Sequence, residues 1–87
     1  MLVIAIYDVN EKRVAKMKKI FDQYMHWTQN SVFEGELTKV QLRELKQKIK
    51  QVMNNDEDSV IFYTVSNPKW IKKESYGIFK PEITNIL

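Results

Sequence analysis

The chain opens with a continuous run of apolar residues that ends in an aspartate. Seven uncharged and mostly apolar residues, Met1 to Tyr7, lead directly into Asp8, and a basic amphipathic segment follows. A short apolar run without alternation is typical of a strand that is buried on both faces. The pattern therefore predicts a central strand over residues 2–8, with Asp8 at the point where the strand leaves the sheet.

Asp8 has two interpretations at this position. A carboxylate on a rigid element at the rim of a sheet is suited to holding a metal ion or transferring a proton. Alternatively, Asp8 is the N-cap of the following helix and Glu11 completes a capping box, or Asn10 serves as the cap in its place. The first ten residues leave both roles open.

Apolar side chains at helical spacing predict a helix over residues 10–24. They form one stripe: Val14, Met17, Phe21 and Tyr24, with Ile20 beside them. The opposite face is basic: Lys12, Arg13, Lys16 and Lys19, with Lys18 close by. Lysines on a helix are commonly just a solvated face. Only Glu11 and Asp22 balance these charges, however, which slightly favours a polyanionic partner.

Residues 26–37 are rich in aromatic and β-branched side chains, which favour strands. This segment is long for one strand, and Asn30-Ser31 in its middle is typical of a turn. We expect two short strands, about 26–30 and 32–37; a single strand with a bulge at Gly35 is the alternative. The lone His26 is interpreted as a surface residue of a strand, because no second ligand lies near it in sequence.

Thr38 and Gln41 form a capping box of the T-x-x-Q type, so a second helix is expected to start there. Its buried stripe is Leu42, Leu45, Ile49, Val52 and Met53, and its outer face carries Lys39, Arg43, Lys46 and Lys50. The helix is expected to end at residues 54–56. Residues 59–65 are again apolar on both faces and predict another central strand.

The chain changes character after Pro68. Residues 69–77 form a short amphipathic segment, and residues 78–87 resemble an extended tail. Pro81 lacks a backbone N–H, so any strand in this tail is expected at a sheet edge.

The predicted order is β-α-β-β-α-β, an α+β ferredoxin-like fold with an extra C-terminal strand or arm over residues 68–87. The 87 residues are expected to form a single domain, 1–87. Two helices cover only one face of such a sheet, yet both central strands are apolar on both faces. A second copy of the chain is the expected cover for the other face, which predicts a homodimer with the arm reaching across.

Composition adds few constraints. The net charge of +3 is too small to indicate nucleic acid by itself. The absence of cysteine excludes disulfides and thiolate metal sites and suits a reducing cytoplasm. No stretch approaches the roughly 20 apolar residues of a membrane span, so we expect a cytoplasmic protein without a membrane partner.

Two motifs carry a resemblance to a known family. Tyr7-Asp8-Val9-Asn10 ends the first strand, and Ser31-Val32-Phe33-Glu34-Gly35-Glu36-Leu37 precedes the second helix. Together at this spacing they resemble the CRISPR-associated Cas2 family, and the likeness extends along essentially the whole chain.

The resemblance implies a ferredoxin-like homodimer that acts in the adaptation stage of CRISPR immunity. The family is described as magnesium-dependent nucleases that act on RNA or DNA. It also bridges dimers of the Cas1 integrase and holds the new spacer duplex. Two functions are therefore expected, a metal-dependent endonuclease and a non-catalytic DNA-bridging scaffold. A ferredoxin-like RNA-binding module is disfavoured. Such modules stack bases on aromatic side chains of the sheet, whereas the sheet residues of this chain are aliphatic.

The resemblance also implies roles for individual residues. Asp8 is the expected catalytic residue and ligand of Mg²⁺. Contacts to nucleic acid are expected from Lys12, Arg13, Lys16, Lys19 and Ser31. Support for the site is expected from Tyr7, Asn10 and Phe33. The first helix is lysine-rich with Arg13 as its only arginine, and lysines contact phosphates as point charges rather than bidentately.

Overall fold

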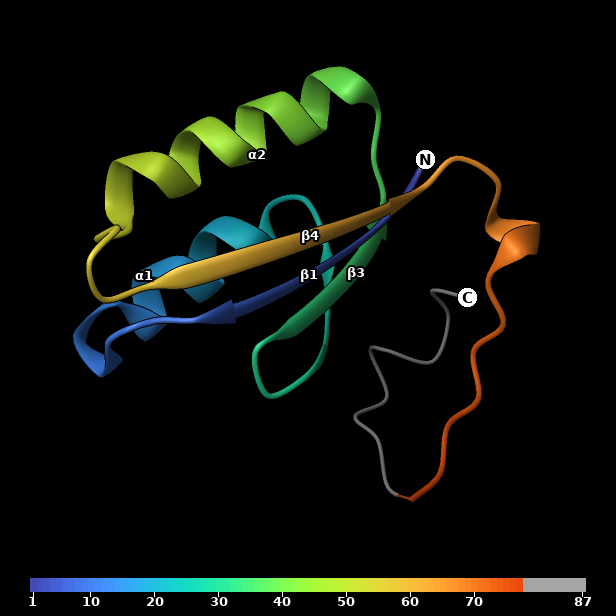
Figure 1. Cartoon of the computed structure of the whole chain (residues 1–87), viewed down its shortest axis with the longest axis horizontal. Coiled ribbons are helices and arrows are strands. Elements are labelled where there is room, and N and C mark those ends of the chain that lie inside the picture. The colour runs from blue at the N-terminus through green and yellow to red at the C-terminus, as the bar shows by residue number, and fades with distance from the viewer. Residues whose placement is uncertain (78–87) are drawn as a thin grey trace.

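The structure is a computed structural model that describes residues 1–77 (Figure 1). Its elements follow the predicted order: β1 (Leu2–Asp8), α1 (Glu11–Asp22), β2 (His26–Gln29), β3 (Val32–Glu36), α2 (Lys39–Val52), β4 (Ser59–Val65) and a short 3₁₀ helix (Pro68–Trp70). Neither α-helix in this part of the chain is long and apolar enough to cross a membrane. The predicted extended tail over residues 78–87 lies outside the described residues.

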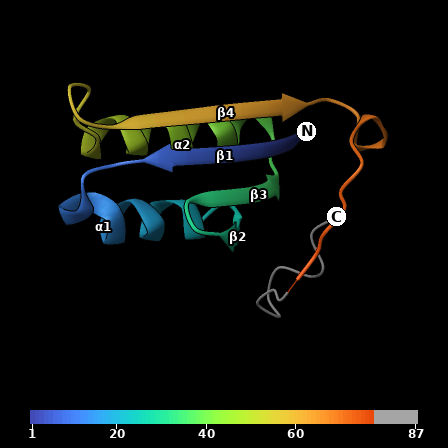
Figure 2. The ribbon, with the colours of Figure 1, turned by 60° about the horizontal axis from the view of Figure 1, so that its bottom comes forward.

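The four strands form one antiparallel sheet in the order β2-β3-β1-β4. Both helices lie on the same face of this sheet, as Figures 1 and 2 show. This is the ferredoxin-like arrangement, so the predicted α+β fold class is confirmed. The central strands of the described sheet are β3 and β1, and β4 is an edge strand with β1 as its one hydrogen-bonded neighbour, so the prediction of residues 59–65 as a central strand is wrong. Val60 and Phe62 pack against the core while Ile61 and Tyr63 are exposed on the other face, so an apolar run does not distinguish an edge strand from a central one.

The core between the helices and the sheet is built around three stacked aromatic rings. The ring of Phe21 on α1 lies 5.3 Å from that of Tyr7 and 5.1 Å from that of Phe33. The odd-numbered residues of β1, Val3, Ala5 and Tyr7, all face this core. The even-numbered residues of β1 consequently face away from the helices.

The β2–β3 connection is a tight turn, as predicted. Asn30 has a positive φ of 46°, a conformation that asparagine tolerates better than most residues. The alternative of one bulged strand is wrong, and the bulge lies in β2, between Trp27 and Gln29. Gly35 pairs regularly with Val3, and a Cβ at Gly35 would lie 3.3 Å from the backbone of Met25. Close approach, rather than a bulge, therefore accounts for this glycine.

The sheet face opposite the helices is apolar and partly open. Ile6, Ile61 and Tyr63 lie on this face with 37%, 48% and 54% of their surface exposed. The segment after β4 contacts this face at Glu34, where the ammonium group of Lys73 lies 3.2 Å from the buried carboxylate. Around Ile6 and Ile61 the same face stays exposed.

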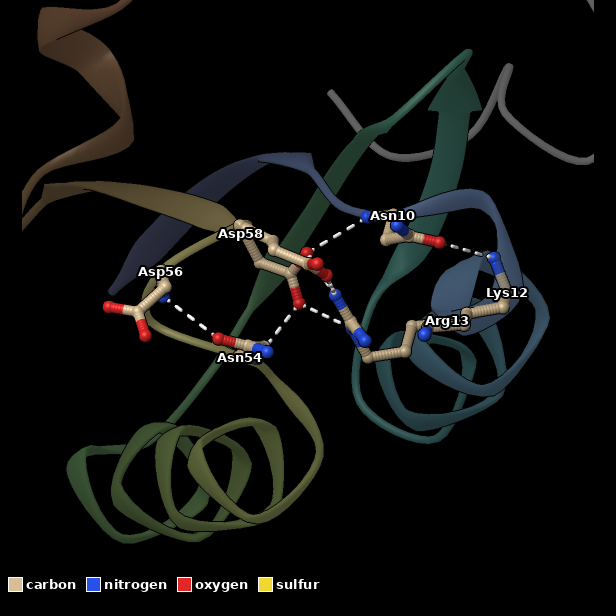
Figure 3. A network of polar contacts seen from close by, with 7 residues as sticks. Asn10, Lys12, Arg13, Asn54, Asp56 and Asp58 are labelled. Carbon is tan, nitrogen blue, oxygen red and sulfur yellow. Dashed lines mark hydrogen bonds and ion pairs between the residues drawn. The ribbon is translucent and has the colours of Figure 1, made fainter.

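A buried carboxylate holds together the two loops at the far end of β1 (Figure 3). Asp58 accepts the backbone N–H groups of Asn10 and Asn54, both at 2.8 Å. It also accepts from Nε and Nη2 of Arg13, at 2.6 and 2.9 Å. Arg13 in addition contacts Glu57. The β1–α1 turn, the first turn of α1 and the α2–β4 loop therefore meet at one side chain, which we call the Asp58 clamp.

The charge of the clamp is fixed by its donors. The Arg13 guanidinium holds the pKa of Asp58 well below its usual range, and the N–H groups of Asn54 and Asn10 lower it further, against the effect of burial. A depressed pKa in the folded state stabilises the fold at a pH above the unfolded value of about 3.9. That contribution is lost as the pH falls toward the folded-state pKa.

We expect Asp58→Asn to lower the melting temperature at pH 7, because the amide cannot accept from all of these donors. The difference from the unchanged protein should shrink as the pH falls from about 4 to about 2, since the charge then ceases to favour the fold. Circular dichroism melts across this range measure both effects. The matched control is Asp56→Asn, in the same loop but exposed, which should change little. A difference for Asp58→Asn that stays constant with pH would contradict this account.

Candidate active site

Asp8 is the last residue of β1 and lies on the open face of the sheet, in line with Ile4 and Ile6. Its Cα partner on the neighbouring strand is Ser59, the first residue of β4. The side chain is exposed, and within residues 1–77 its carboxylate makes no hydrogen bond or ion pair. Asp8 thus presents two acceptor oxygens to solvent from the end of a rigid, buried strand.

Asn10, rather than Asp8, caps α1. The side-chain oxygen of Asn10 accepts the backbone N–H of Lys12 at 3.1 Å. The interpretation of Asp8 as the cap is therefore wrong, and the alternative cap at Asn10 is confirmed. Because Asn10 caps the helix, the Asp8 carboxylate does not have to accept a backbone N–H of α1.

The backbone on both sides of Asp8 is held in place. Asp8 itself lies in the β1–β4 ladder opposite Ser59, and the N–H of Asn10 is bound by the Asp58 clamp. Asn10 thus contributes by positioning the chain, with its side chain on the helix and its backbone on the clamp. Such support from the surroundings is what keeps a site residue in one geometry.

Tyr7 and Phe33 lie on the other face of the sheet from Asp8. Tyr7 is 4% exposed and Phe33 is fully buried, and both rings stack in the core. Burial raises the pKa of the Tyr7 phenol, so it stays protonated at neutral pH and does not act as a base. Both aromatic residues can assist the site only by holding β1 and β3 in place.

The structure brings Ser31, which is distant in sequence, next to the end of β1. It lies in the β2–β3 turn, half-buried, and its carbonyl oxygen accepts the N–H of Tyr7 at 3.1 Å. The turn therefore adjoins the strand one residue before Asp8. His26 is an exposed strand residue opposite Glu34, as its isolation in the sequence indicated.

The predicted cations of α1 divide into two groups. Lys12, Lys16 and Lys19 are exposed and form no ion pair with any residue of 1–77. Arg13 is different, because its Nε and Nη2 are committed to Asp58 and Glu57 and its side chain is only 15% exposed. The structure gives Arg13 an internal role in the clamp, which leaves α1 with fewer free cations than its sequence indicates.

A metal ion at Asp8 would need ligands from outside residues 1–77. No group of three or more histidine, cysteine, aspartate or glutamate side chains gathers in this part of the chain. Mg²⁺ is, however, commonly held by one or two carboxylates together with phosphate oxygens and water. The exposed, uncommitted carboxylate of Asp8 fits this pattern when nucleic acid or a second copy supplies the remaining oxygens.

Known proteins resemble this chain along most or all of its length. The family model of the CRISPR associated protein Cas2 matches residues 1–73. The CRISPR-associated endoribonuclease Cas2 of Methanosarcina acetivorans is 39% identical over 87 residues, 100% of both chains. That of Thermotoga maritima is 46% identical over 82 residues, 94% of each chain.

Solved structures agree with the sequence relatives. A crystal structure of a Cas2 protein superposes with a TM-score of 0.84 at 40% identity, covering 100% of this chain and 98% of that one. The Cas2 of Streptococcus pyogenes gives a TM-score of 0.78 at 30% identity, covering 88% of this chain and 100% of that one. On this family match, these relatives and this fold, the chain belongs to the CRISPR-associated Cas2 family.

Proposed function

We propose that this chain is a Mg²⁺-dependent endonuclease that hydrolyses phosphodiester bonds in RNA or DNA, with Asp8 as metal ligand and catalytic residue. The observation that carries the proposal is the Asp8 carboxylate: exposed, without a partner within residues 1–77, and fixed at the end of a buried strand. The curated relatives named above are called endoribonucleases, which supports nuclease activity and favours RNA as the substrate.

A second copy of the chain would complete the site. Ile6, Ile61 and Tyr63 form an exposed apolar face, and an 87-residue chain gains stability by burying such a face. A two-fold axis makes one face cover its own copy. Asp8 lies on this same face, so an axis passing near it would bring two carboxylates to one ion. One carboxylate from each copy suits the ligand needs of Mg²⁺.

The chain's own residues would then have simple tasks. Bound Mg²⁺ supplies Lewis-acid activation of the scissile phosphate and lowers the pKa of a coordinated water. Asp8 would hold the ion, while the Asp58 clamp and the β1–β4 ladder hold Asp8. The exposed Lys12, Lys16 and Lys19 would attract the phosphate backbone by charge.

In the cell, we expect the protein to act in the cytoplasm, in the adaptation stage of CRISPR immunity with the Cas1 integrase. A second candidate function is a non-catalytic scaffold that bridges duplex DNA and the integrase. The observation that favours it is that, within residues 1–77, no cluster of three or more potential metal ligands gathers around Asp8, while several exposed lysines have no acidic partner.

Asp8→Asn is expected to reduce Mg²⁺-dependent cleavage at least about 100-fold, because losing a metal ligand removes several kcal/mol of transition-state stabilisation. The assay uses end-labelled single-stranded RNA and duplex DNA, with Mg²⁺ or with EDTA. Asp56→Asn, another exposed aspartate near this end of the sheet, is the matched control and should cleave normally.

Two outcomes would count against the endonuclease. Cleavage by Asp8→Asn at the unchanged rate would remove Asp8 from the mechanism. Absence of Mg²⁺-dependent cleavage by the unchanged protein on both substrates, with duplex binding retained, would leave the scaffold as the function.

Ile61→Glu is expected to convert the dimer to a monomer, because it places a charge in the middle of the proposed interface. Light scattering coupled to size exclusion gives the mass directly, and cleavage should fall with the loss of the second Asp8. Val40→Glu, on the exposed side of α2, introduces the same charge away from this face and should leave the mass unchanged. An unaltered dimer in Ile61→Glu would show that the open face is not the interface.

A further inference from the structure

The outer flank of α2 carries a row of four cations, Lys39, Arg43, Lys46 and Lys50. Spacings of four, three and four residues place them on one side of the helix. All four side chains are exposed. At 1.5 Å per residue the row extends for about 16 Å along the helix. We call it the α2 cation row.

No acid neutralises this row within residues 1–77. Glu44 is the only acidic residue of α2, and it lies on the other flank, where it accepts from the hydroxyl of Tyr24 at 3.4 Å. Lys48, on that same flank, donates to Gln23 at 2.9 Å and lies 4.9 Å from the Tyr24 ring. The flank toward α1 is thus internally paired, while the outer flank is a uniform strip of positive charge.

Part of the row is held in place before any ligand arrives. Lys46 and Lys50 line a groove of about 250 Å³ whose other walls are apolar: Ile49, Met53, Val60 and Phe62. The ammonium group of Lys46 lies 5.5 Å from the centre of the Phe62 ring, within the range of a cation–π contact. Lysine stems that pack on apolar walls keep their charges at the rim. Less conformational freedom is then lost when these charges contact a ligand.

The row also lies close to the proposed site. The groove beside Lys46 and Lys50 has β4 as its other wall, and Figure 2 shows α2 running along β4 and β1. Val60 of this groove is the Cα partner of Tyr7, and the neighbouring Ser59 is the partner of Asp8. Only the edge strand β4 therefore separates the Lys50 end of the row from the face that carries Asp8.

We propose that the α2 cation row binds the phosphate backbone of a nucleic-acid strand and guides it around the edge of β4 toward Asp8. A continuous, unpaired row of cations is suited to a regularly spaced polyanion. α1 is the weaker anchor, because Arg13 is committed to the clamp and Lys18 to Asp22. The proposed binding of nucleic acid follows from the α2 cation row alone. The proposal that the bound strand is guided toward Asp8 rests on the proposed endonuclease function.

Binding can be tested without cleavage. Asp8→Asn protein in EDTA is titrated with labelled single-stranded RNA at several salt concentrations, and the affinity is followed by fluorescence anisotropy. Each lysine or arginine contact contributes about 0.7 to the slope of log K against log salt for a single strand. Lys39→Gln/Arg43→Gln and Lys46→Gln/Lys50→Gln are each expected to lower the slope by about 1.4, which is twice that value.

The matched control is Lys48→Gln, which removes the same charge from the inner flank of the same helix and should leave the slope unchanged. Circular dichroism confirms that all variants remain folded. Duplex DNA forms a parallel arm, with about 0.9 expected per contact. Unchanged slopes on both nucleic acids for both double variants would overturn the proposal. So would stronger, row-dependent binding of an acidic polypeptide, since the row would then serve a protein partner.

The two proposals fail in different ways. Row-dependent binding by a protein that never cleaves would refute the endonuclease and leave the α2 row intact. Normal Mg²⁺-dependent cleavage with slopes that do not respond to the α2 variants would refute the row alone.

Discussion

The geometry at the end of β1 depends on the ion pair between Asp58 and Arg13. A fully buried carboxylate is costly unless it is paired and its oxygens are satisfied. Here donors from the β1–α1 turn, from α1 and from the α2–β4 loop all converge on it. If any of these segments shifts, the buried Asp58 carboxylate loses a hydrogen-bond donor. Asp58 and Asp8 therefore have different roles: the carboxylate of Asp58 is bound within the fold, and that of Asp8 makes no hydrogen bond or ion pair within residues 1–77.

The regular elements were predictable because their signals are local. The apolar runs predicted the strands Leu2–Asp8 and Ser59–Val65 with the observed bounds, but the second is an edge strand and not a central one. The capping box of α2 is present as expected, with Thr38 and Gln41 each accepting the other's backbone N–H. The bulge was misplaced, because Gly35 signals a close approach as readily as a bulge. Only the position of Met25 in space distinguishes the two.

The candidate site was predictable only in part, for two physical reasons. Neighbours along a strand point to opposite faces, so Tyr7 belongs to the core while Asp8 belongs to the open face. The contacts of Arg13 lie 44 and 45 residues along the chain, where no local pattern can indicate them. An arginine in a basic helix therefore resembles a phosphate contact until its distant partners are known. Asp8 was proposed from its position in the sequence, and its carboxylate is not bound to the helix because Asn10 is the cap.

Apolar and cationic side chains occupy different surfaces of the described chain, and both surfaces lie near Asp8. The apolar patch around Ile6 and Ile61 occupies the open face, and the α2 cation row lies on the helix side beyond β4. Asp8 stands where these two regions approach each other across one edge strand. An apolar face suits a second copy of the chain, and a cationic flank suits a polyanion. At this boundary, a second copy of the chain could supply another carboxylate, and a bound nucleic acid could supply phosphate oxygens. Together with Asp8, these groups would make a more complete Mg²⁺ site than one chain provides.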